Sequence, residues 1–97
     1  MSPSSRCDLC EAVTKTTRYY DDEECWIADC LICRVPMVVW RMHDSAPPEV
    51  VRTRLIERLG PVAERFFASR DWYYDDHMRN IPDHYHGHAR GVATTRR

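Results

Sequence analysis

Three histidines near the end of the chain, His84, His86 and His88, stand at every second position. The chain holds five histidines in all, so this row gathers most of them. Successive side chains of a β-strand point to opposite faces, so a strand over residues 84–90 directs all three imidazoles to one face. Imidazole acts near neutral pH as a metal ligand, a proton carrier or a nucleophile. The row therefore predicts a functional site, and its neighbours must decide of which kind.

The five cysteines of the chain predict metal-bound or free thiols, and the cysteines and histidines together allow three alternative metal sites. Two Cys-x-x-Cys pairs, Cys7 with Cys10 and Cys30 with Cys33, are spaced as in a four-cysteine structural zinc site. Zinc also accepts two cysteines with two histidines, which would join Cys7 and Cys10 to His43 and one histidine of the row. Alternatively, two histidines of the row hold an open catalytic metal ion. Core thiols are an equally good interpretation of Cys25, Cys30 and Cys33, so the residues alone leave these sets open.

Length and composition predict one small domain. The chain has 97 residues, of which 43% are hydrophobic, and a formal net charge of −1. The near-neutral charge lacks the global electrostatic signature of a nucleic-acid-binding protein. The sequence has neither a signal peptide nor an apolar run long enough to span a membrane, so we expect a cytoplasmic protein. We expect residues 1–6 to be a flexible arm, residues 7–90 the domain and residues 91–97 a C-terminal tail.

Periodicity predicts an α+β fold. The alternating and apolar segments indicate strands over residues 16–20, 25–30, 37–42, 71–74 and 84–90. Pro47-Pro48-Glu49 favours a helix start, with Ser45 as a cap. Val51, Leu55, Leu59, Val62 and Phe66 follow as one apolar face. Gly60-Pro61 interrupts this face, which predicts a kink or two shorter helices. The expected domain is an antiparallel sheet of about five strands with one main helical segment.

The order of these motifs resembles the histidine triad superfamily, in the zinc-containing branch related to galactose-1-phosphate uridylyltransferase. The family's His-x-His-x-His motif stands here as His84-Tyr85-His86-Gly87-His88. The resemblance also includes an early Cys-x-x-Cys pair, an acidic hairpin turn and a Val-Val strand that ends at a histidine. It runs over residues 7–90. Gly87 departs from the motif, because the family usually has a β-branched residue or leucine there, and Arg90 stands where an apolar residue is common.

The resemblance implies a histidine-triad-like fold with a structural zinc ion held by Cys7, Cys10, His43 and His84. Family members usually form homodimers, which a chain with so small a core makes plausible.

The resemblance also implies an enzyme that acts on nucleotides or nucleotide conjugates. His86 takes the place of the nucleophile that attacks an α-phosphate and forms a covalent nucleotidyl-histidine. His88 takes the place of the phosphate contact, and Arg90 could join it in binding the substrate phosphate. The chain is then a nucleotide hydrolase or a nucleotidyl transferase.

Two other functions compete with this one. The first is a non-enzymatic interaction module of the zinc-ribbon kind, built on Cys7, Cys10, Cys30 and Cys33. The second is a metalloenzyme whose catalytic metal ion lies on the terminal histidines.

Overall fold

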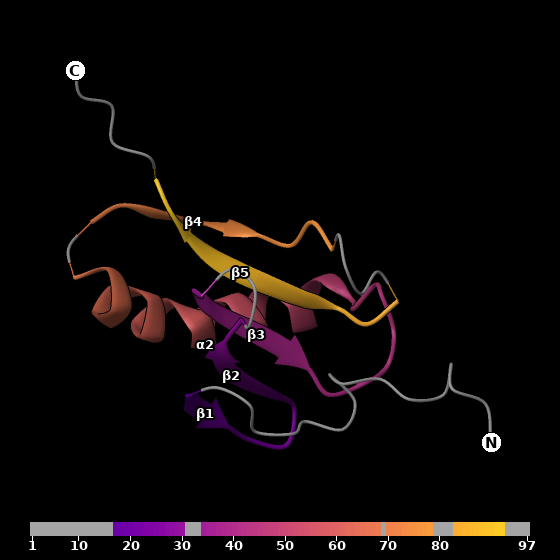
Figure 1. Ribbon diagram of the computed structural model, residues 1–97. Helices are drawn as coiled ribbons and strands as arrows, with labels where there is room; N and C mark the ends of the chain where they lie inside the picture. Colours follow the sequence, from indigo (N-terminus) through magenta and orange to yellow (C-terminus); the bar gives the residue numbers. More distant parts are fainter. Residues whose placement is uncertain (1–16, 31–33, 69, 79–82, 93–97) are drawn as a thin grey trace.

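Five antiparallel strands and one helix form the described part of the chain in this computed structural model (Figure 1). The structure describes residues 17–30, 34–68, 70–78 and 83–92. The elements are β1 (Arg18–Asp21), β2 (Cys25–Asp29), β3 (Pro36–Trp40), α2 (Glu49–Phe67), β4 (Trp72–Asp75) and β5 (His86–Gly91). The strand order is β1-β2-β3-β5-β4, so the last strand inserts between β3 and β4. The predicted α+β class and the predicted number of strands are confirmed.

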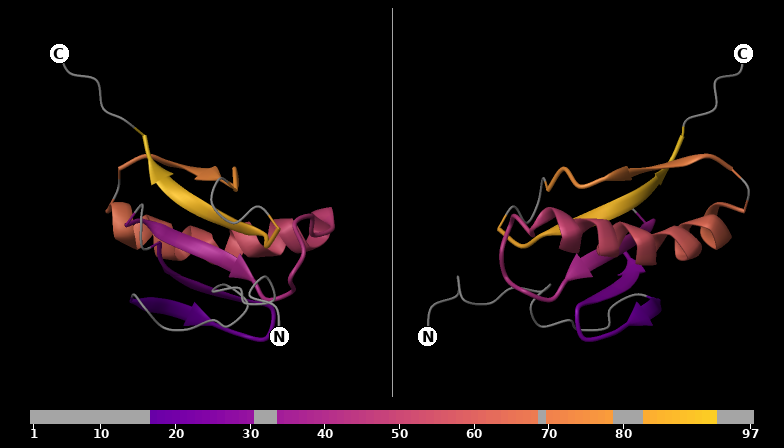
Figure 2. Two further views of the ribbon diagram at one scale, coloured as in Figure 1. Left: turned by 45° about the vertical axis from the view of Figure 1, so that its right-hand side comes forward. Right: turned by 180° about the vertical axis from the view of Figure 1, so that it is seen from behind.

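One face of the sheet is covered by α2, as the two views of Figure 2 show. The helix buries Leu55, Leu59, Ala63 and Phe67, which follow one another at intervals of four residues, and also Val62. Phe66, predicted to face the core, is 41% exposed, and the buried position belongs to Phe67 instead. The prediction was wrong because two adjacent phenylalanines fit the helical period almost equally well.

Of the two alternatives predicted at Gly60-Pro61, a kink or two shorter helices, the second is also wrong. Helix α2 continues through Pro61 from Glu49 to Phe67. Proline removes one backbone hydrogen bond, but the burial of Leu59 and Val62 on either side of it stabilises the helix against the sheet. Ser45 does not cap this helix, since the residue at the cap position is Pro48 and no side chain bonds there.

Each face of the sheet carries a buried apolar cluster. Toward α2 it presents Cys25, Ile27, Val38, Trp40, Tyr85 and Ala89. The opposite face carries a second buried cluster of Trp26, Ala28, Met37 and Val39. Strand β3 is buried along its whole length, so its side chains exclude water on both faces of the sheet.

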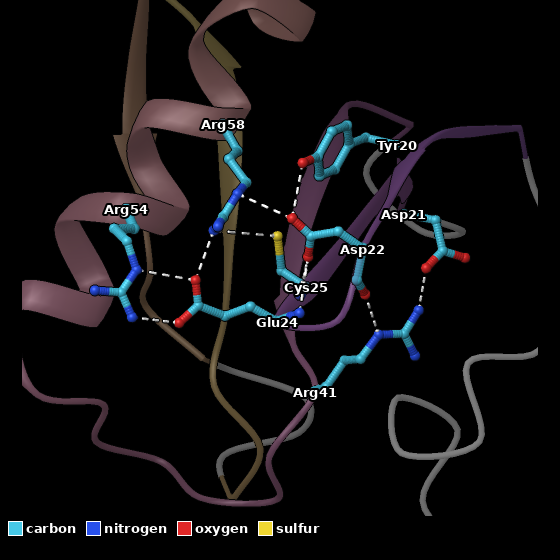
Figure 3. A network of polar contacts seen from close by, with 8 residues as sticks. All are labelled: Tyr20, Asp21, Asp22, Glu24, Cys25, Arg41, Arg54 and Arg58. Carbon is cyan, nitrogen blue, oxygen red and sulfur yellow. Dashed lines mark hydrogen bonds and ion pairs between the residues drawn. The ribbon is translucent and has the colours of Figure 1, made fainter.

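Ion pairs tie the β1–β2 turn to α2 (Figure 3). Arg54 donates to Glu24 through Nε and Nη2 at 3.1 and 2.5 Å. Arg58 reaches the carboxylates of Glu24 at 2.8 Å and Asp22 at 3.1 Å. The hydrogen bonds from Arg54 contribute most to lowering the pKa of Glu24 to about 2, so the turn stays charged well into acid. Arg41, just after β3, pairs with Asp21 and donates to the Asp22 carbonyl at 2.7 Å.

No helix in the described ranges is both long enough and apolar enough to cross a lipid bilayer.

Candidate functional site

The histidine row lies on the face of the sheet opposite α2. In the β3–β5 ladder His86 faces Val39 and His88 faces Met37, and residues paired in this way share a face. Val39 and Met37 belong to the cluster remote from the helix. The shared face is confirmed for His86 and His88, whereas His84 precedes β5, which begins two residues later than the predicted strand.

His86 is held in one tautomer by the backbone. Its side chain is 6% exposed, and Nδ1 lies 2.8 Å from the carbonyl oxygen of His84. A carbonyl oxygen only accepts hydrogen bonds, so Nδ1 of His86 carries the hydrogen. In the neutral ring the lone pair is then on Nε2. This arrangement makes Nε2 the unprotonated ring nitrogen of His86.

His84 is completely buried and faces His43, which follows the end of β3. The Nε2 atom of His84 donates to the Trp40 carbonyl at 2.6 Å, so its Nδ1 bears the lone pair in the neutral ring. That Nδ1 lies 3.2 Å from Nδ1 of His43, with the two rings nearly perpendicular at 83°. On its other side, Nε2 of His43 lies 3.4 Å from the carboxylate of Asp83. Burial is the main cause that lowers the pKa of His84, and the neighbouring His43 adds to it.

This histidine pair fits half of a tetrahedral zinc site. Two imidazole nitrogens at zinc-bonding distance are separated by about 3.3 Å along an edge of the tetrahedron, and the observed separation is 3.2 Å. Each ring also has its other nitrogen directed to a carbonyl or a carboxylate, as metal-bound histidines commonly do. The other two predicted ligands, Cys7 and Cys10, lie outside the described residues.

The described residues contain no group of three or more histidine, cysteine or acidic side chains that could hold a metal ion. The row itself does not converge, because His84 and His86 direct their Nδ1 atoms to different partners. Of the alternative four-cysteine set, only Cys30 is described, and it packs beside the cluster that contains Trp26. Cys25 is a buried thiol on the α2 side.

His88 and Arg90 continue the row along β5. The rings of His86 and His88 lie with their centroids 5.5 Å apart, and His88 is 6% exposed. Arg90 donates from Nε to the carboxylate of Asp75 at 2.6 Å. Asp75, on β4, is also the residue paired with His88 across the ladder. Sequence reasoning missed Asp75, although a carboxylate at the end of a predicted strand was a usable signal.

Steric crowding explains why residue 87 is a glycine, which the sequence alone did not reveal. A Cβ atom built there would lie 2.6 Å from Cε1 of Tyr74 and closer still to Cζ and the hydroxyl oxygen of the same ring. Tyr74 thus crosses β5 directly behind the histidine row, on the α2 side. A glycine inside a strand often marks such a close approach, and this was the signal that could have identified Tyr74.

Comparison with known proteins identifies the fold. No family profile and no curated protein matches the sequence. Among solved structures, a histidine triad protein from Clostridium difficile superimposes with a TM-score of 0.63 over 100% of both chains, at 14% identity. The chain therefore has the fold of a histidine triad protein, with its own histidine row on the strand that the motif predicts.

Proposed function

We propose that this protein is a nucleotide hydrolase or nucleotidyl transferase of the histidine triad type. The observation that carries the proposal is the hydrogen bond from Nδ1 of His86 to the His84 carbonyl, 2.8 Å long, which leaves Nε2 as the nucleophilic nitrogen. The fold likeness to a histidine triad protein supports the same assignment. In this proposal the substrate is a nucleotide whose α-phosphorus carries a phosphate, phosphoester or phosphoramidate leaving group.

The proposed reaction has two displacements at phosphorus. The Nε2 lone pair of His86 attacks the α-phosphorus, an N–P bond forms, and the bond from phosphorus to the leaving group breaks with its electron pair. The leaving group takes up a proton and departs. Water or another acceptor then attacks the same phosphorus through its oxygen, an O–P bond forms, and the N–P bond breaks with its electron pair returning to Nε2 of His86. The attacking group loses its proton. The product is a nucleoside monophosphate or a new nucleotide conjugate.

Neighbouring basic groups would stabilise the phosphoryl charge. In the proposal His88, whose ring centroid lies 5.5 Å from that of His86, contacts the phosphate oxygens. Arg90 lies further along the same face, and its pairing with Asp75 at 2.6 Å restricts the guanidinium to one position. A guanidinium oriented in advance loses less entropy when it binds an anion.

We further propose that Cys7, Cys10, His43 and His84 hold a structural zinc ion. Zinc would supply a fixed anchor for His84, and so for the carbonyl that orients His86, without taking part in the displacements.

A trapping experiment tests the nucleophile. The protein is mixed with nucleoside phosphoramidates or dinucleoside polyphosphates and quenched in alkali, because the N–P bond of a phosphohistidine hydrolyses in acid. Intact and peptide mass spectrometry should find a nucleoside monophosphate group added to the peptide that contains His86. The His86→Asn variant should form no adduct, whereas the matched variant His77→Asn, at an exposed histidine outside the row, should form it as the wild type does. Turnover without an adduct in the wild type would show that His86 is not a nucleophile.

Metal content tests the zinc site and separates it from the zinc-ribbon alternative. We expect one zinc ion per chain by elemental analysis, its loss in His43→Ala and in Cys7→Ser, and its retention in the double variant Cys30→Ser/Cys33→Ser. Chelation should lower the melting temperature of the wild type, because binding of a structural zinc ion contributes on the order of 10 kcal/mol to such sites. The reverse pattern, with zinc lost only in the Cys30/Cys33 variant, would favour the ribbon module.

A further inference from the structure

A partly buried chain of polar groups lies on the α2 side of the sheet, directly behind the histidine row. The hydroxyl of Tyr85, a residue only 3% exposed, donates to Oδ2 of Asp76 at 2.8 Å. The hydroxyl of Tyr74 lies 2.7 Å from that of Tyr85. Since the single hydroxyl hydrogen of Tyr85 goes to Asp76, Tyr74 must donate to Tyr85. The order of donation is therefore Tyr74 to Tyr85 to Asp76.

Helix α2 completes this chain through Arg52. Its Nε donates to the same Oδ2 of Asp76 at 2.9 Å, and its guanidinium carbon lies 5.5 Å from the centre of the Tyr74 ring. We call these four residues, Arg52, Tyr74, Asp76 and Tyr85, the tyrosine clamp. Burial opposes the charge of Asp76, but the hydrogen bonds from Tyr85 and Arg52 keep its pKa below the ordinary value. Burial raises the pKa of Tyr85 to about 12, so the phenols remain hydrogen-bond donors at neutral pH.

The clamp contacts the residues on both sides of His86. Tyr85, the residue before His86, is held through its hydroxyl. Gly87, the residue after His86, packs so closely against the Tyr74 ring that a Cβ atom would not fit. The strand segment that carries His86 is thus held from behind by groups of β4, α2 and the residue that follows β4.

Tyr85 lies between the two residues whose hydrogen bond sets the tautomer of His86. The hydrogen bond from Nδ1 of His86 to the His84 carbonyl spans Tyr85, so the backbone torsions of Tyr85 set its length and direction. The Tyr85 backbone is itself bonded on both sides, with its N–H donating to Asp44 at 2.7 Å and its carbonyl accepting from Trp40 at 3.3 Å. Its side chain supplies the third attachment.

We propose that the tyrosine clamp positions His86, with Tyr85 as the positioning residue that keeps the Nδ1–H of His86 on the His84 carbonyl. The inference rests on the proposed function only in taking His86 as the nucleophile. It adds a requirement particular to this chain, which is that Gly87 leaves room for Tyr74 and that Tyr74 hydrogen-bonds to Tyr85.

The test compares Tyr85→Phe with Tyr20→Phe, which removes a tyrosine–aspartate hydrogen bond of 2.7 Å remote from the row. The first readout is the pair of imidazole ¹⁵N shifts of His86, recorded at a pH where the ring is neutral. We expect the Nδ1–H tautomer to dominate in the wild type and in Tyr20→Phe, and to be mixed in Tyr85→Phe. The second readout is steady-state kinetics, in which Tyr85→Phe should lower kcat on the order of 10-fold to 100-fold and leave KM within about twofold.

If Tyr85→Phe folds and keeps both the His86 tautomer and the kcat of the wild type, the inference that the tyrosine clamp positions His86 is wrong. If Tyr85→Phe does not fold, Asp76→Asn decides, since it keeps the aromatic packing and weakens the same chain of donors. It should shift the tautomer in the same direction, and an unchanged spectrum would overturn the inference. The ¹⁵N measurement needs no substrate. A clamp-dependent tautomer in a protein without turnover would therefore support the clamp and contradict the proposed function.

Discussion

Replacing His86 with alanine is expected to lower kcat/KM on the order of 10⁴-fold or more, which corresponds to about 5.5 kcal/mol of transition-state stabilisation. The proposed covalent path depends on Nε2 of this ring, and the residues beside it cannot substitute. Nδ1 of His84 is directed at His43, and Arg90 is paired with Asp75. Steady-state kinetics with a nucleoside phosphoramidate measures the loss.

Two matched variants show whether the loss is specific to His86. His88→Ala should lose less, on the order of 10²-fold, because it removes a charge-stabilising contact and leaves the nucleophile in place. His77→Ala, at an exposed histidine outside the row, should keep the wild-type rate. Because His86 is buried, its replacement could also unfold the protein, so the melting temperature of each variant must be compared with that of the wild type. If His86→Ala retained even a tenth of the activity, His86 could not be the nucleophile.

Replacing Gly87 with alanine should destabilise the fold by about 3 kcal/mol. The added Cβ overlaps the Tyr74 ring, so that ring must leave its site. The protein then loses the burial of a large aromatic side chain, worth about 2 kcal/mol, and a hydrogen bond to Tyr85, worth about 1 kcal/mol. For a domain of this size the melting temperature should fall by about 15 °C. Urea denaturation or calorimetry measures both quantities.

The matched control is Gly60→Ala, because nothing lies within 4 Å of the Cβ that it adds to α2. That variant should be stabilised by about 1 kcal/mol, since alanine is the better helix residue. Truncating Tyr74 should remove the conflict, so Gly87→Ala/Tyr74→Ala should be no less stable than Tyr74→Ala alone. Additive losses in the double variant would mean that Tyr74 is not what makes glycine necessary at this position.

The local patterns of the chain predicted most of its elements. Alternating and apolar segments identified the strands, and the i, i+4 spacing of Leu55 and Leu59 identified α2. The same patterns failed where tertiary packing competes with propensity. Helix α2 runs through Pro61, and Phe67 is buried in place of Phe66. Propensity describes an isolated segment, whereas the burial of a helix face against a sheet can outweigh one missing hydrogen bond.

The same distinction between local pattern and tertiary packing applies to the candidate site. The alternation of His86 and His88 by itself determined that these imidazoles share a face, because side chains alternate along every strand. The residues alone left open which histidine of the row would meet His43, and the tertiary structure places His84 there, 41 positions later in the chain. It also brought Arg52, Tyr74 and Asp76 to the residues beside His86, and it explained Gly87. These contacts depend on the insertion of β5 between β3 and β4, a long-range pairing that no local pattern encodes. The sequence determined which groups are available for chemistry, and strand order and packing decided which of them meet.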